Sequence, residues 1–193
     1  MPEIMLTEEH VYHVDGIERP GVNQILTDTG LVKPYNGDPW YGKRGTYTHT
    51  ACHMLDMGDL DEETLDPAIK GYVEAYKKFK AESGMVFLHS EEKLWHPQFN
   101  YCGTPDRFYP VLDIKTGDMH EPLTLELYAE IIRVNRQDMK DKTDYELFRT
   151  AYFLRLKEDG TYNLKPYKLD ATNKTIALSA VNVWHERRRR GTL

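Results

Sequence analysis

The stretch "YCGTPDRFYPVLDIKTG", residues 101–117, sets two aspartates and a lysine among short apolar runs. Asp106 precedes a predicted turn, and Asp113 and Lys115 follow it in a strand-like pattern. Carboxylates are depleted in β-strands, so two of them on one hairpin need a compensating charge. The stretch therefore predicts a β-hairpin that carries a charged site.

The alternation of side chains along the second strand separates its apolar and charged residues. Leu112 and Ile114 share one face, which can pack against a helix. Asp113 and Lys115 share the other face, where an acid and an amine stand two residues apart. The strand is therefore expected to present its charges away from the helix that covers it.

The turn of this hairpin determines how close the two aspartates lie. A loop symmetric about Tyr109-Pro110 sets Asp106 directly opposite Asp113, with Cβ atoms about 4.5–5.5 Å apart. The bulky tyrosine and the proline do not suit a tight two-residue turn, which favours a four-residue loop. Opposed carboxylates repel unless a cation lies between them or one is protonated.

A divalent cation is the compensation that these side chains suggest. Carboxylate oxygens without soft ligands nearby suit Mg²⁺ or Mn²⁺. The Lys115 ammonium beside a hydrated metal can stabilise developing negative charge or orient a water molecule, as phosphodiester hydrolysis requires. We expect the hairpin to form one wall of a metal site, and an ordinary exposed strand is the alternative.

The remaining chain predicts one α/β (α+β) domain over residues 1–193, with a mixed central sheet flanked by helices and peripheral β-hairpins. Turn, cap and periodicity signals predict its elements. In chain order these are a hairpin turning at Asp15-Gly16, a short helix ending near Gly30, a loop over 33–42, helices over 43–57 and 67–83, strands over 85–96, 101–107 and 111–116, a helix over 122–135, a hairpin turning at Asp159-Gly160, and a helix over 171–190.

Composition excludes several classes of protein. With 40% hydrophobic and 29% charged residues, the 193-residue chain can form a core. It has neither an 18-residue apolar run nor a signal-peptide pattern, so we expect a cytoplasmic protein without membrane spans. Cys52 and Cys102 predict reduced, buried thiols. The net charge of −6 does not favour nucleic-acid binding, and the four arginines of "HERRRRGTL" could hold phosphates or form a solvated helix end, which we favour.

Two half-motifs in the opening stretch resemble those of a known enzyme superfamily. "GTPDR" followed by "LDIKTG" is similar to the PD-(D/E)XK nucleases, and more narrowly to the RecB-like and Cas4-like branch found in small phage and prophage exonucleases. Asp106 matches the aspartate of the first half, and Asp113 and Lys115 match the second. The resemblance implies a restriction-endonuclease-like core and Mg²⁺- or Mn²⁺-dependent hydrolysis of DNA.

The resemblance extends over nearly the whole chain. "RGTYTH", 44–49, is similar to the helix that carries a metal-binding histidine, here His49. "SEEKLWHPQFNYCGTPD" resembles the strand before the motif, and its spacing matches Glu91 better than Glu92 to the acid near the metal. The opening hairpin with "PGVNQIL" and the closing "AYFLRLKEDGTYNLKPY" resemble the two ends of the branch.

The resemblance implies a role for each matching residue. It implies that the metal ligands are His49, Asp106, Asp113 and the backbone carbonyl of Ile114. Glu91 would hold a second metal or its water. Lys115 would orient the attacking hydroxide or stabilise the phosphorane-like charge, and Tyr128 would support the site.

The chain departs from the branch at two places. Thr124 stands where a glutamine usually precedes Tyr128 by four residues and helps to position the substrate or the lysine, so the resemblance makes Thr124 a candidate contact with DNA. The four cysteines of the Cas4 iron–sulfur cluster are not matched, so that cluster is not expected. Thr124 and the acidic net charge support a second hypothesis, a catalytically weak or inactive DNA- or protein-binding module on a nuclease fold.

Several side chains near His49 could contact DNA. Arg44 and Tyr47, with Lys43, lie where the predicted helix begins, and they could contact phosphates or form a solvated helix end. The aromatic residues of the preceding loop could stack on unpaired bases or cover an edge of the core, which we favour; they are Tyr35, Trp40 and Tyr41.

His49 and His53 are spaced like a two-histidine zinc site. No glutamate follows His49 as in H-E-x-x-H, and no thiolate pair follows, so we expect a hard cation at His49 and a structural His53. DNA is the expected partner. A homo-oligomer, a phage recombination partner and a subunit that supplies activity remain open.

Overall fold

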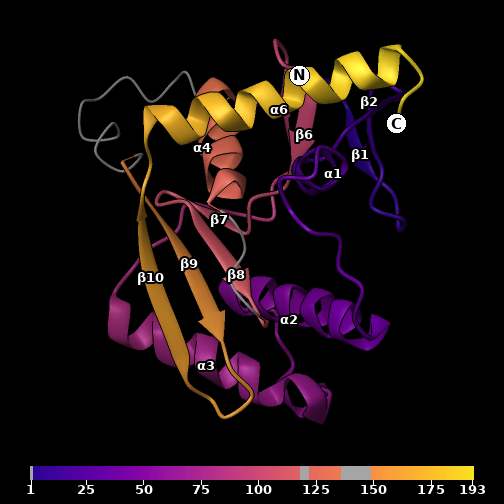
Figure 1. Cartoon of the computed structure of the whole chain (residues 1–193). Helices are drawn as coiled ribbons and strands as arrows, with labels where there is room; N and C mark the ends of the chain where they lie inside the picture. The colour runs from indigo at the N-terminus through magenta and orange to yellow at the C-terminus, as the bar shows by residue number, and fades with distance from the viewer. Residues whose placement is uncertain (1, 118–121, 136–148) are drawn as a thin grey trace.

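A computed structural model describes residues 2–117, 122–135 and 149–193. Its central sheet has the strand order β10-β9-β8-β7-β4. These strands are β4 (His89–Ser90), β7 (Arg107–Phe108), β8 (Leu112–Lys115), β9 (Thr150–Leu156) and β10 (Tyr162–Lys168). In the part of this sheet that the structure describes, only β8 and β9 pair in parallel, and a parallel pair requires a long crossover. That crossover contains helix α4 (Leu123–Asn135) (Figure 1).

Among the described residues, smaller sheets and four further α-helices surround the central sheet. The strands are β1 (Ile4–Leu6), β2 (Tyr12–Val14) and β3 (Ile17–Arg19) in one sheet, and β5 (Leu94–His96) and β6 (Tyr101–Gly103) in another. The helices are α1 (Val22–Asp28), α2 (Pro39–Met57), α3 (Pro67–Ser83) and α6 (Ala171–Arg189), with a 3₁₀ turn, η1 (Glu62–Thr64).

Helices cover both faces of the central sheet (Figure 1). On one face Leu112 and Ile114 of β8 share a buried cluster with Tyr76 and Phe79 of α3. On the other face Phe153 of β9 joins the apolar residues of α4 and α6. The predicted mixed sheet flanked by helices is therefore confirmed, and so is the prediction that Leu112 and Ile114 pack against a helix.

Local signals set most helix boundaries correctly. α3 begins after Asp66, whose side chain accepts a hydrogen bond from the Ala68 N–H at 2.8 Å, and it ends at Gly84 with φ 63°. The expected start of α2 at residue 43 is wrong, because the helix begins at Pro39. Asp38 accepts from the Trp40 N–H at 2.9 Å and caps it. An aspartate followed by a proline thus begins both helices, Asp66-Pro67 at α3 and Asp38-Pro39 at α2.

Two expected strands are each divided. Instead of one strand over 85–96, the short β4 pairs with β7 in the central sheet, while β5 pairs with β6 elsewhere. Glu91, just after β4, has φ 53°, which turns the chain out of the extended conformation. The strand expected over 101–107 is likewise interrupted at 104–106, so that β6 and β7 belong to different sheets.

The register of the motif hairpin agrees with the prediction. Arg107 pairs with Leu112, which leaves the four residues 108–111 between them. Continued by one residue, this antiparallel register aligns Asp106 with Asp113. Both cysteines are buried and free, as predicted. Within the described ranges, each helix is too short or too polar to cross a membrane.

Candidate active site

Three potential metal ligands converge where α2, β7 and the residue after β4 meet. His49 Nδ1 lies 2.9 Å from Asp106 Oδ1 and 3.9 Å from Glu91 Oε1. One ligand atom from each of the three residues falls within 4.8 Å of the others. We call His49, Glu91 and Asp106 the ligand cluster.

The backbone holds Glu91 in this cluster. Its N–H donates to the Asp106 carbonyl oxygen at 3.2 Å. Its φ of 53° is uncommon for a residue with a side chain and costs on the order of 1 kcal/mol or more. Non-glycine residues in this region often mark functional sites, because the surrounding structure must hold them there.

Asp113 and Lys115 form a largely buried ion pair beside the cluster. The Lys115 ammonium lies 3.0 Å from Oδ1 and 2.9 Å from Oδ2 of Asp113, which is 2% exposed. Asp106 Oδ2 accepts a 2.5 Å hydrogen bond from the Ile114 N–H. The carboxylates of Asp106 and Asp113 are thus compensated in part by protein cations, Lys115 and His49. Among the described residues, the ligand cluster does not include Asp113.

Burial and mutual repulsion raise the proton affinity of two of the acids. Burial and then the Asp106 carboxylate raise the pKa of Glu91 to about 7, although His49 and Arg107 oppose this. Burial raises the pKa of Asp113 against the effect of Lys115, and Asp106 adds to the rise. Glu91 is therefore the acid in the ligand cluster that holds a proton near neutral pH.

Asp106 differs from the other two acids because it faces more cations. Burial acts to raise its pKa, but His49, Lys115 and the Ile114 N–H outweigh burial and lower it. Burial also acts against the charged forms of His49 and Lys115, and their acidic neighbours reverse the effect, so both of these pKa values are raised. The stable state of this group of side chains is therefore an ionised Asp106 carboxylate beside positively charged His49 and Lys115.

Arg107 is a site residue that the sequence reasoning missed. Its side chain is fully buried, and its Nε donates to Asp56 Oδ2 at 2.6 Å and to the Tyr76 hydroxyl at 3.1 Å. Its Nη1 donates to the Asp106 carbonyl oxygen at 2.5 Å and lies 3.6 Å from Glu91 Oε1. The available signal was its place directly after the motif aspartate, which in a strand points it to the opposite face.

Tyr128 and Tyr12 border the site from the other side. Burial, then Asp113 and other nearby groups raise the pKa of Tyr128 well above its usual value. Tyr12, another residue missed from the sequence, bonds the Thr104 hydroxyl at 2.9 Å, and burial raises its pKa to about 12. Thr124 is 2% exposed in α4, and its contact with DNA stays a prediction.

The residues predicted to contact DNA lie on α2. Arg44 is half-buried, and its Nη2 donates to the Thr116 carbonyl oxygen at 3.2 Å, just beyond β8. Tyr47 is 49% exposed. Tyr35, Trp40 and Tyr41 are also exposed, so the expectation that they cover an edge of the core is wrong.

Two other candidate features have structural partners. His53 Nδ1 lies 2.6 Å from Ser90 Oγ and is outside the ligand cluster, as expected for a structural histidine. The arginine run ends α6, where Arg189 and Arg190 pair with Glu186, which agrees with a helix end.

A cavity of about 690 Å³ adjoins the site at Glu91 and extends along the chain segment 85–90.

The donor set of the ligand cluster suits a hard divalent cation. One imidazole nitrogen and two carboxylate oxygens match the ligand preferences of Mg²⁺ and Mn²⁺, and no thiolate is among the cluster residues. Glu91 Oε1 is buried without a hydrogen-bond partner, although Arg107 and His49 lie at ion-pair distance. A bound cation would satisfy this incompletely bonded Glu91 oxygen, which faces His49.

Comparison with solved structures identifies the class of fold, which the chain shares with a candidate exonuclease. A candidate exonuclease from Eubacterium rectale superposes with a TM-score of 0.52 at 12% identity, over 88% of this chain and 74% of that chain. LHK-Exo in complex with dAMP superposes less closely, with a TM-score of 0.40 at 14% identity over 90% and 93% of the two chains. LHK-Exo is an alkaline exonuclease from Laribacter hongkongensis. No family model and no curated protein matches the sequence.

Proposed function

We propose that this chain is a Mg²⁺- or Mn²⁺-dependent deoxyribonuclease, and more narrowly an exonuclease of the phage and prophage type that acts in DNA recombination, repair or replication. The observation that carries the proposal is the ligand cluster beside the Asp113–Lys115 ion pair, in a chain with a nuclease fold. Hard ligands next to a buried ammonium are the groups that metal-assisted phosphodiester hydrolysis needs.

The roles of the residues follow from their contacts. His49, Asp106 and Glu91 would hold the cation, with Asp113 and the Ile114 carbonyl as further ligands. When bound, the cation supplies Lewis-acid polarisation of the phosphoryl oxygens and lowers the pKa of a bound water.

Lys115 lies beside the cluster with its ammonium held by Asp113, so it can orient a water or stabilise charge that develops on the phosphoryl group. Tyr128 supports this arrangement from α4. Arg44, Tyr47 and Thr124 are the proposed DNA contacts.

A cleavage assay on defined DNA ends tests the proposal. Purified protein is incubated with linear and circular DNA in Mn²⁺ and in EDTA, next to the variants Asp113→Ala and Val183→Ala. We expect metal-dependent digestion of linear DNA by wild type and by Val183→Ala, an exposed α6 position. Asp113→Ala should lose at least about 100-fold in rate, because Lys115 loses its positioning partner.

The assay also distinguishes the second candidate function, a binding module without turnover, from the proposed nuclease. Thr124, in place of the usual glutamine, favours a module that binds without turnover. DNA binding with no hydrolysis of either substrate in Mn²⁺ would support that module and refute the nuclease. Equal rates for wild type and Asp113→Ala would refute the assigned site.

A further inference from the structure

Exposed aromatic side chains gather in one short segment of the molecule. In residues 2–117, 122–135 and 149–193, the only aromatic side chains that are exposed by more than about a third are four that lie between positions 35 and 47. They are Tyr35 (62% exposed), Trp40 (40%), Tyr41 (51%) and Tyr47 (49%). We call these four residues the aromatic surface. Large exposed apolar groups concentrated in this way mark binding sites more often than scattered ones do.

The local structure holds the aromatic surface in place. Asp38 caps α2 through the Trp40 N–H at 2.9 Å, and the Tyr35 hydroxyl donates to the Asp38 carbonyl oxygen at 3.2 Å. The Tyr35 ring folds back over Gly37, where a Cβ would lie only 2.2 Å from the hydroxyl oxygen. The loop and the first turn of α2 are thus ordered by their own contacts, which lowers the entropy cost of binding a ligand there.

Cations are interleaved with the aromatic rings. Trp40 and Tyr47 are seven residues apart on α2, so they lie on the same side of the helix, with Lys43 and Arg44 between them. Residues 33–47 contain three cationic side chains and one acid, whereas the whole chain has a net charge of −6. This segment is therefore a locally positive and aromatic surface on an acidic protein.

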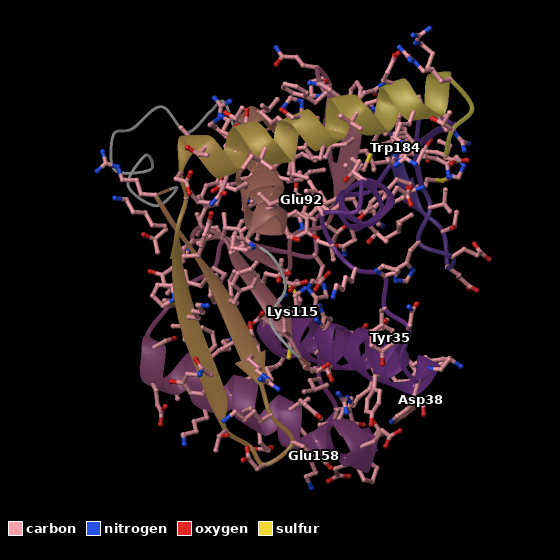
Figure 2. All side chains as sticks on the ribbon, viewed as in Figure 1. Tyr35, Asp38, Glu92, Lys115, Glu158 and Trp184 are labelled. Carbon is pink, nitrogen blue, oxygen red and sulfur yellow. The ribbon has the colours of Figure 1, made fainter. Side chains whose placement is uncertain are left out.

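The aromatic surface is connected to the candidate active site. The Arg44 guanidinium lies 4.8 Å from the centroid of the Tyr41 ring and donates to the Thr116 carbonyl, next to Lys115. The same helix carries His49, two residues beyond Tyr47. Figure 2 shows Tyr35 and Asp38 at the N-terminal end of α2 and Lys115 beside that helix. Trp40 and His49 are about 13 Å apart along the helix axis and lie on opposite sides of α2, so a nucleic-acid strand would pass from the aromatic rings around the helix to the ligand cluster.

This composition selects one kind of occupant. Rings that alternate with Lys and Arg suit a single nucleic-acid strand, because bases stack on the rings while the cations contact the phosphates. A duplex keeps its bases stacked inside and offers none to the rings. An apolar partner protein would gain little from the cations between the rings.

We propose that the aromatic surface binds an unpaired DNA strand by base stacking and leads it to the ligand cluster. The proposal rests on the proposed nuclease function for the role of that cluster, and it deepens that function by naming the form of the substrate. Stacking on Trp40 and Tyr47 provides affinity, while Lys43 and Arg44 contact the phosphates between them.

Binding without hydrolysis tests the proposal. Fluorescence anisotropy in EDTA measures the affinity for a fluorescein-labelled single-stranded oligodeoxynucleotide, for its blunt duplex, and for the same strand with abasic sites. Trp40→Ala and Tyr47→Ala should each weaken binding of the single strand by roughly 5- to 150-fold. Trp40→Phe, which keeps an aromatic ring, should restore most of it. Val183→Ala, 48% exposed on α6, is the matched surface control.

The abasic strand separates stacking from phosphate contact. Wild type and Trp40→Ala should bind the abasic strand equally, because it offers no bases to stack. Undiminished binding of the normal strand by both alanine variants would overturn the proposal. A loss of equal size on the abasic strand would also overturn it, since the contact would then be to the backbone.

A cleavage assay of the same preparations in Mn²⁺ tests the nuclease proposal separately from the stacking proposal. Wild-type protein that binds the single strand through Trp40 but never hydrolyses it would refute the nuclease and leave the stacking surface standing. Hydrolysis by wild type together with unchanged binding by Trp40→Ala and Tyr47→Ala would refute the stacking surface alone.

Discussion

Replacing Arg107 by alanine removes the buried cation on the interior side of the candidate active site. Arg107 is fully buried, and its guanidinium contacts Asp56, the Tyr76 hydroxyl and the Asp106 carbonyl oxygen, with Glu91 at 3.6 Å. The guanidinium also lies 5.5 Å from the centroid of the Tyr76 ring. Without it, Asp56 and Glu91 lose a shared counter-charge in a poorly solvated environment.

The expected loss of stability follows from these contacts. Removing one partner of a buried ion pair costs about 3–5 kcal/mol. Asp56 keeps Lys80 at 2.5 Å and the Tyr76 hydroxyl at 2.8 Å, so the lower end applies. We expect a loss of about 3 kcal/mol in the free energy of unfolding, or roughly 6–12 °C in Tm for a chain of this size.

Urea unfolding and calorimetry of the metal-free protein measure this loss. Arg189→Ala is the control, because that arginine has a 72% exposed side chain and pairs with Glu186 at the surface. Its loss should stay within about 1 kcal/mol. If Arg107→Ala costs no more than Arg189→Ala, the guanidinium does not compensate the buried acids and the reasoning fails.

Three further predictions concern the site and the packing behind it. Lys115→Ala should keep Mn²⁺ affinity in calorimetric titration but lower the single-turnover cleavage rate by about 10²–10³-fold; an unchanged rate would remove Lys115 from the mechanism. Glu91 has a raised pKa of about 7, so the metal-free wild type should lose roughly 3 kcal/mol relative to Glu91→Gln as pH rises from about 4.5 to 7. Parallel urea-stability profiles of the two proteins in EDTA would contradict this. Gly71→Ala sets a Cβ 1.8 Å from the Glu158 carbonyl oxygen and should cost about 1–3 kcal/mol or more, whereas Gly42→Ala, with open space around it, should not; equal urea midpoints would show that the β9–β10 turn can move away.

The sign of the Glu91 prediction follows from proton binding. Its pKa is raised in the folded protein, so the folded state holds the proton more tightly than the unfolded chain does. Stabilisation by the protonated carboxyl is complete below pH 4.5 and is lost as pH rises through 7. Glu91→Gln removes this dependence, because an amide does not titrate in that range.

Much of the fold could be predicted because its signals are short-range. The caps and the αL glycine of α3, the helix α6, and the hairpins at Asp15-Gly16 and Asp159-Gly160 are encoded within a few residues. The motif hairpin belongs to this group, since alternation and loop length sufficed for its register. Divided strands such as β4 and β5 escaped prediction, because the sheet that a segment joins depends on distant partners.

At the candidate site too, some features follow from local sequence and others only from packing between distant segments. The spacing of the motif hairpin selected Asp106, Asp113 and Lys115, and the resemblance to the PD-(D/E)XK nucleases added His49 and Glu91. Whether these residues meet depends on how α2 packs against the sheet, and that packing depends on apolar contacts far apart in the chain. The buried position of Arg107 and the exposure of the aromatic surface depend on the same packing, because burial is a property of all the surrounding elements.

Local sequence thus encodes the elements and the chemical groups that they carry, because helix caps, turns and side-chain alternation act over one or two turns of chain. The mutual positions of those groups come from packing. It brings an acid with a positive φ, a helical histidine and the aspartate just before β7 within a few ångströms of one another. The physical reason is that hydrophobic burial is non-directional and summed over the whole domain, so short segments do not specify which buried charges become neighbours.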